Sequence, residues 1–218
     1  MQTYPPCVNI PPFTGTEIGK AIQKLKNGTS PGIDEICTEM FKHAPQELNE
    51  LTAEILNSSV ESDDYLDVLK IGILTPPQKP PKKGMARKTN VRPIILLSIS
   101  RKIMAICIIH RTWDKLKNKI PIDQAAYQTG RSITEQVFCM KIIAEKAIIS
   151  QNYEIIIMMI DMSKAFDTVN KSKLMSFLER HLEPNEMRMM YILINELTLK
   201  VRINKKFGED ILTSIGVC

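Results

Sequence analysis

Six apolar residues in succession, Ile155–Ile160, dictate more about the fold than any other part of this 218-residue chain. Isoleucine or methionine occupies every position, so the run has no polar face, which is the pattern of a strand buried on both sides in a covered sheet. Asp161 follows at once. A carboxylate at the end of a buried strand lies at a sheet edge, where ligands commonly bind. The run therefore predicts both the centre of a sheet and a candidate site.

Apolar spacing on either side of this run predicts an α+β fold, in which a β-sheet part with covering helices follows a helical and basic N-terminal part. Asp34 is the predicted N-cap of the second helix. The predicted apolar face of the third helix consists of Leu48, Leu51, Ile55 and Leu56. The predicted helices are Thr16–Asn27, a helix after Asp34, Pro45–Ser59, Ser100–Lys117, Thr134–Ile149, Lys171–His181 and Pro184–Leu197. The predicted strands are Ile71–Leu74, Glu154–Asp161, Lys200–Ile203 and Asp210–Thr213, with Arg92–Leu97 as a strand or turn.

Positive charge is concentrated in one segment. The whole chain has a net charge of +5, yet no acidic residue and ten basic ones lie between Val68 and Trp113. Such a segment is suited to a polyanion, namely nucleic acid, nucleoside triphosphate or anionic lipid. A solvated loop with lysines for solubility is the alternative. Within the segment, four prolines between Pro76 and Pro81 remove backbone donors, which predicts an exposed, stiff, basic loop.

The carboxylate of Asp161 has a possible role in metal chemistry. A nucleotidyl transferase uses carboxylates to hold two divalent ions about 3.5–4 Å apart, which activate the attacking hydroxyl and neutralise phosphate charge. One carboxylate is insufficient, so at least one more has to come from elsewhere. From the motif alone, a turn-capping role for Asp161 is equally supported.

Cysteine usage and the N-terminus indicate an intracellular protein. The five cysteines show no metal-type spacing and are expected to be reduced thiols. The N-terminus lacks the apolar stretch of a signal peptide, and the longest apolar runs fall well short of the roughly 20 residues that span a bilayer. We therefore expect a soluble protein of the nucleus or cytoplasm, with no membrane partner.

Several blocks along the chain, in order, resemble motifs of one enzyme family. The segment Asp161–Val169 resembles motif A of non-LTR (LINE-type) retrotransposon and group II intron reverse transcriptases. Four further blocks resemble the N-terminal extension motif, the fingers motif, the block that follows it, and the first three residues of motif B. These blocks are Lys26–Asp34, Arg92–Ser98 with Arg101–Ile103, Gln124–Ser132, and Gly216–Cys218. Any single block is weak evidence, whereas the ordered set is specific.

The resemblance implies roles for residues around the incoming nucleotide. Asp161 would be a catalytic metal ligand for Mg²⁺. Phe166 would be the steric gate, because a bulky ring against C2′ leaves no room for a ribose hydroxyl. A core phenylalanine at the start of the next helix is the alternative for Phe166. Asp167 and Lys164 would be structural, with Asp167 a plausible N-cap for the helix that follows.

The resemblance also implies contacts to phosphate. Arg92 would grip the triphosphate of the nucleotide, since its planar fork suits phosphate oxygens. One lysine of the proline-rich loop would join it, and Lys79, Lys82 and Lys83 stay open as candidates. Two further groups of basic residues would contact template or primer. For the second group, solvated side chains without such contacts are the alternative. The first group is Arg87, Lys88, Arg101 and Lys102, and the second is Lys200, Arg202, Lys205 and Lys206.

The resemblance implies that the chain as a whole is a fragment of a right-hand polymerase with an antiparallel palm sheet. Its predicted parts are a helical N-terminal extension (1–60), fingers (61–150) and partial palm (151–218). RNA template, DNA primer and dNTP would be its partners. No aromatic-x-Asp-Asp sequence follows Asp161, so these residues are expected not to polymerise alone. A catalytically silent RNA-binding remnant and a group II intron-type enzyme remain alternatives.

Overall fold

The computed structural model describes residues 10–61, 66–75, 94–150, 154–162, 164–195, 197–203, 206–212 and 216. The chain forms two compact units, the first comprising Met1–Trp113 with Phe166–Cys218 and the second Asp114–Ala165. The first unit combines helices with a four-stranded sheet, which confirms the predicted α+β class. The division into extension, fingers and partial palm stays a prediction.

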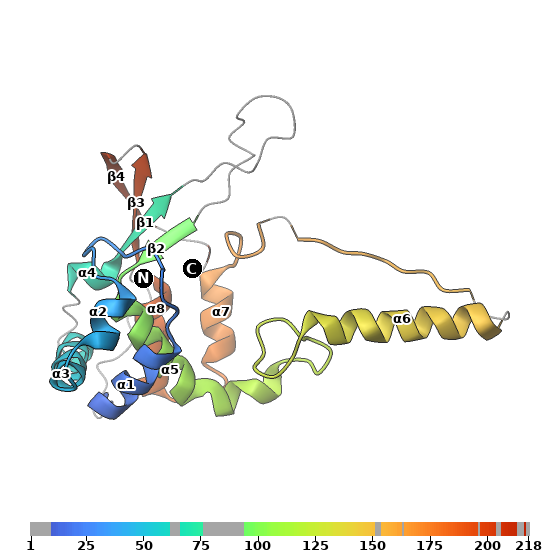
Figure 1. Ribbon diagram of the computed structural model, residues 1–218, viewed down its shortest axis with the longest axis horizontal. Coiled ribbons are helices and arrows are strands. Elements are labelled where there is room, and N and C mark those ends of the chain that lie inside the picture. The colour runs from blue at the N-terminus through green and yellow to red at the C-terminus, as the bar shows by residue number, and fades with distance from the viewer. Residues whose placement is uncertain are drawn as a thin grey trace. The chain divides into compact units, whose positions relative to one another are not determined.

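The sheet of the first unit is mixed, which differs from the predicted antiparallel arrangement. Its strands are β1 (Ile71–Thr75), β2 (Ile94–Leu97), β3 (Thr198–Ile203) and β4 (Lys206–Leu212), in the order β2-β1-β3-β4 (Figure 1). The β1–β2 and β3–β4 pairs are antiparallel, while β1 and β3 run parallel. The parallel pair joins segments far apart in the sequence, so its geometry depends on the helices between them rather than on a local turn.

Seven helices of the described chain accompany this sheet, and they match most of the predicted positions. They are α1 (Gly15–Lys24), α2 (Thr38–His43), α3 (Glu47–Glu61), α4 (Asp67–Lys70), α5 (Ile99–Leu116), α7 (Lys171–Leu178) and α8 (Pro184–Asn195). Their core includes fully buried side chains on α1, α5, α8 and β1. These side chains are Ile18, Ile73, Ile103, Met104, Ile108, Met187 and Met189.

The predicted N-cap of the second helix is wrong, and the predicted apolar face of the third helix is confirmed only in part. Cys37 occupies the N-cap of α2, while Asp34 accepts a hydrogen bond from the Ile36 backbone in a local turn. On α3, Leu56 is fully buried and Leu48 half-buried as predicted, whereas Leu51 and Ile55 are exposed. The buried face also contains small residues, namely Ala53, Thr52 and Ser59, and the hydroxyls of the last two donate to carbonyls one turn earlier. Small side chains let α3 pack closely on α1, and this packing outweighs the leucine pattern.

Arg111 fastens the segment before α1 to helix α5. Its guanidinium donates to the carbonyls of Pro11 and Pro12 at 2.6 and 2.8 Å, pairs with Glu17 at 2.7 Å, and lies 4.6 Å from the Phe13 ring centroid. Glu17 also closes a capping box with Thr14 at the start of α1. The Thr-x-x-Glu signature of that box is visible in the sequence.

Replacing Glu17 by glutamine should change how stability depends on pH. Hydrogen bonds from Arg111 hold the pKa of Glu17 below its ordinary 4.5, against the opposing effect of partial burial. A lowered folded-state pKa stabilises the fold above the unfolded pKa, and this contribution is lost as pH falls through the folded value. Urea unfolding should therefore show wild type and Glu17→Gln converging below about pH 4.5. The exposed Glu54→Gln on α3 is the control, and a gap that stays constant with pH would contradict the pairing.

The second unit contains a 3₁₀ turn (Lys117–Lys119), α6 (Ile133–Ser150) and an extended segment that follows α6. Ile155–Ile160 lies in that segment and is not a strand, so the predicted central strand is wrong. Its side chains are exposed, with Ile156 at 92%. A strand requires hydrogen bonds to a neighbour. None of the described strand pairings includes these residues. No helix in the described ranges is long and apolar enough to cross a membrane.

Candidate functional site

Asp161 lies in the extended segment of the second unit, with its carboxylate exposed. Since the preceding residues form no strand, the predicted position at a sheet edge is not observed. Within the described ranges, no three or more His, Cys, Asp or Glu side chains gather where they could hold a metal ion. An exposed carboxylate remains available to a hard cation such as Mg²⁺ but supplies only part of a coordination shell. The catalytic role of Asp161 stays a prediction.

Phe166 lies in a turn before α7, and its side chain is 55% exposed. A core phenylalanine would be buried, so this position does not support the alternative of a core residue. The helix that follows begins at Lys171 and is capped by Asn170, whose side-chain oxygen accepts from the Lys173 backbone at 3.0 Å. The plausible capping role of Asp167 is therefore wrong.

The structure joins two of the blocks that carry the resemblance. The backbone N–H of Gly216 donates to the carbonyl of Val169 at 2.8 Å, so the start of the last block lies on the turn that contains Phe166. Gly216 has φ +85°, and a Cβ there would lie 3.0 Å from the Asp167 carbonyl oxygen. The position requires glycine both for its backbone conformation and for this close approach. Sequence reasoning identified the two blocks but not their contact.

A second contact joins the first block to the fingers-like block. A Cβ on Gly32 would lie 2.5 Å from the Ser98 backbone nitrogen, where β2 passes into α5. Nearby, Lys42 donates to the Leu25 carbonyl at 2.6 Å, and Glu39 accepts from the Gly28 backbone. These bonds hold the loop in which Gly32 lies directly against the backbone of Leu97 and Ser98. The Ser-Pro-Gly sequence predicts a turn at Ser30–Gly32, whereas the structure has its turn at Gly32–Glu35, where the Glu35 backbone donates to the Gly32 carbonyl at 3.3 Å.

Substituting Gly216 by alanine should loosen the turn around Phe166. The positive φ and the contact with Asp167 together should cost about 1–3 kcal/mol of local stability. Amide hydrogen exchange should then be faster at Val169 and at the first residues of α7. Gly208→Ala is the matched control, because a Cβ there meets only the Val201 carbonyl oxygen at 3.8 Å. Equal protection in both variants would show that the contact with Val169 is unimportant.

The candidate phosphate-binding residues fall into two groups. Lys79, Lys82, Lys83, Arg87, Lys88 and Arg92 lie outside the described residues. Arg101 and Lys102 lie on α5, where Lys102 is half-buried. The prediction that Arg101 binds nucleic acid is wrong, because its side chain is 3% exposed.

The guanidinium of Arg101 is used inside the first unit. It donates to the carbonyls of Leu69 on α4 and of Ile192 and Leu193 on α8, the last two at 3.4 and 2.8 Å. All three carbonyls belong to the final turns of their helices, where backbone acceptors lack intrahelical partners. A cation is also favoured at a helix C-terminus. Arg101 therefore caps two helices that lead into the adjacent parallel strands β1 and β3.

The β3–β4 hairpin contains the remaining basic candidates. Lys200 pairs with Asp210 on the neighbouring strand at 3.3 Å, which lowers its value as a phosphate contact. Arg202 is half-buried, Lys206 is exposed, and Lys205 lies outside the described residues. A role for this hairpin in binding template or primer stays a prediction.

Comparison with known proteins shows that this chain is similar to reverse transcriptases. A family model described as reverse transcriptase (RNA-dependent DNA polymerase) matches residues 80–214, which is more than half of the chain. The chain is 28% identical over 171 residues to a Xenopus laevis protein named "Transposon TX1 uncharacterized 149 kDa protein", covering 78% of this chain and 13% of that protein. It is 26% identical over 210 residues to the "Probable RNA-directed DNA polymerase from transposon BS" of Drosophila melanogaster, covering 95% of this chain and 23% of that protein. The chain thus spans less than a quarter of either relative.

Proposed function

This chain belongs to the reverse transcriptase family, and from that premise we propose that it is the fingers and partial palm of a non-LTR retrotransposon RNA-directed DNA polymerase. The named relatives are transposon proteins, which agrees with the resemblance to the retrotransposon type. The structural observation that best supports the proposal is the contact of Gly216 with Val169, because it joins the motif A-like and motif B-like blocks. RNA template, DNA primer and dNTP are the proposed partners.

Asp161 is the proposed ligand for catalytic Mg²⁺. Its carboxylate is a hard oxygen donor that suits this cation, and its exposure leaves it accessible. When bound, two such ions lower the pKa of the primer hydroxyl and neutralise charge on the transferred phosphate. Asp161 alone cannot complete the coordination, so the remaining carboxylates are proposed to come from the polymerase outside these 218 residues.

The other proposed roles concern the incoming nucleotide. Arg92, with Lys79, Lys82 or Lys83, would bind the triphosphate through charge-assisted hydrogen bonds. The exposed ring of Phe166 would exclude a ribose 2′-hydroxyl, and the contact between Gly216 and Val169 supports the turn on which this ring lies. The chain itself thus supplies groups that bind, orient and select the nucleotide.

Primer extension tests the polymerase proposal. The longer polypeptide that naturally includes this sequence should extend a DNA primer on an RNA template with dNTPs and Mg²⁺, while the 218-residue chain alone should not. Extension by the isolated chain would contradict the assignment of the missing carboxylates. If the longer polypeptide bound RNA without any extension, the catalytically silent remnant would be the better account.

RNA binding by the 218-residue chain should weaken steeply with salt. Neutralising about five phosphates of a single strand gives a slope near −3.5 in log affinity against log salt, or roughly a hundredfold loss between about 50 and 200 mM. Fluorescence anisotropy with a labelled RNA measures this slope. Replacing Lys82, Lys83, Arg87 and Lys88 by glutamine should make it shallower, whereas Lys141→Gln with Lys146→Gln should not. Affinity that is flat with salt would exclude the basic segment as the binding surface.

A further inference from the structure

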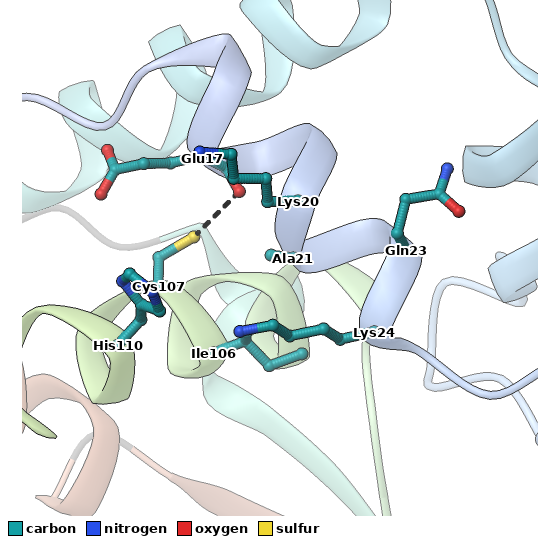
Figure 2. A pocket seen from close by; sticks show the side chains of 8 residues that line it. All are labelled: Glu17, Lys20, Ala21, Gln23, Lys24, Ile106, Cys107 and His110. Carbon is teal, nitrogen blue, oxygen red and sulfur yellow. Dashed lines mark hydrogen bonds between the residues drawn. The ribbon is translucent and has the colours of Figure 1, made fainter.

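A cavity of about 550 Å³ lies between α1 and α5 in the first unit (Figure 2). This volume is within the range of about 300–1,000 Å³ that holds small organic ligands. None of its lining residues is among those proposed above for nucleotide transfer. The cavity is therefore a separate feature of the fold whose chemistry has to be read from its own residues.

The charge at this cavity favours an anion. Lys20 and Lys24 lie one helical turn apart on α1 and are exposed. No ion pair joins either ammonium to an acidic side chain in the described ranges. The carboxylate of Glu17 is already paired with Arg111 at 2.7 Å. Two lysines at this spacing can contact one phosphate group, with their charge uncompensated by the lining.

Apolar groups from both helices complete the lining of the cavity. Ala21 and Cys107 are buried, and Ile106 is half-buried beside them. Burial raises the pKa of the Cys107 thiol to about 11, and its Sγ donates to the Glu17 carbonyl at 3.9 Å. The thiol is thus neutral and behaves as a small apolar group. His110 adds an exposed imidazole, a ring on which nucleobases commonly stack.

We propose that the α1–α5 cavity binds one nucleoside monophosphate unit, with its phosphate on Lys20 and Lys24 and its base against Ile106 and His110. In Figure 2 the Lys24 side chain extends from α1 in the direction of Ile106 on α5, and both residues line the same cavity. The ligand is a free mononucleotide or one nucleotide of a single strand, because both present the same phosphate and base. This inference goes beyond polymerisation and requires no metal.

Isothermal titration of the 218-residue chain in EDTA tests the proposal, because chelation removes any contribution of Mg²⁺ at Asp161. AMP should bind at least about tenfold more tightly than adenosine, which lacks the phosphate, or ribose 5-phosphate, which lacks the base. Lys20→Gln with Lys24→Gln should weaken AMP binding at least about tenfold. Lys141→Gln with Lys146→Gln, which removes the same charge from α6, should leave it unchanged.

Two further experiments show whether the bound nucleotide is free or part of a strand, and whether the apolar side of the cavity contributes to binding as well as the charge. If a short oligo(rA) loses affinity in the Lys20/Lys24 variant as AMP does, the ligand is a nucleotide within a strand; loss for AMP alone identifies the free nucleotide. Ile106→Glu, which places a carboxylate on the apolar side, should also weaken AMP binding while circular dichroism stays native. Equal binding of AMP by wild type and both cavity variants, or equal binding of AMP and ribose 5-phosphate, would overturn the proposal. Neither result would bear on primer extension.

Discussion

Replacing Asp161 by asparagine in the proposed polymerase should reduce primer extension by on the order of 10³-fold. Loss of a metal-binding carboxylate removes several kcal/mol of transition-state stabilisation, and each 1.36 kcal/mol corresponds to a factor of about ten in rate. Asparagine keeps the size of the side chain while removing its charge. The variant should therefore fold normally and bind RNA with the affinity of wild type, and its defect should appear in the rate of nucleotide addition.

Asp167→Asn is the matched control for this experiment. Asp167 is exposed like Asp161, carries the same charge and lies six positions later in the same block. Its backbone carbonyl, not its carboxylate, is the group that Gly216 approaches most closely. The asparagine variant should retain most of its activity. If Asp161→Asn kept more than about a tenth of wild-type extension, or if both variants lost activity equally, Asp161 would not be the metal ligand.

Local chemistry made much of the helical structure predictable. Thr14 and Glu17 show a capping signature that depends only on residues three positions apart, and the structure contains that box. Strands β1 and β3 lie near their predicted positions, and β2 lies where the sequence predicted a strand or turn. Strand β4 begins at Lys206, four residues before the predicted start at Asp210.

The failures share a dependence on distant partners. Ile155–Ile160 has the composition of a buried strand, but a strand exists only when another backbone accepts and donates along it. The face of α3 depends on how closely α1 approaches, which the leucine spacing does not encode. For the candidate site, sequence motifs selected Asp161 and Phe166, whereas the contact of Gly216 with Val169 required the folded chain. Motifs thus supplied the candidate residues, and the structure showed that two of the motif-bearing blocks are in contact.

Arg101 is the clearest case in which a charged residue of the basic segment serves the fold. Ten basic residues lie between Val68 and Trp113, but Arg101 and Arg111 are bound to backbone carbonyls within the first unit. Neither guanidinium is free to contact phosphate. The capacity of the segment to bind a polyanion therefore depends on its other basic residues.

Arg101→Met should destabilise the first unit by about 3–5 kcal/mol, because it removes the donors of three helix-terminal carbonyls in a buried site. A buried acceptor left without a partner costs about 1–3 kcal/mol. The favourable interaction of the cation with two helix C-termini is lost as well. With a total stability of about 5–15 kcal/mol for a typical domain, such a loss lowers the urea midpoint severely.

Arg101→Lys provides a graded test in case the methionine variant does not fold. Lysine keeps the positive charge but has a single ammonium, which cannot span the carbonyls of α4 and α8 as the guanidinium fork does. Its urea midpoint should lie between those of wild type and Arg101→Met. Lys102→Met on the same helix, half-buried, should change stability by less than about 1 kcal/mol. Because α4 and α8 lead into β1 and β3, amide exchange should accelerate first at the Ile71–Thr198 end of the parallel pair. If Arg101→Met unfolded at the same urea concentration as Lys102→Met, the arginine would have no structural role, and a nucleic-acid contact would again have to be considered.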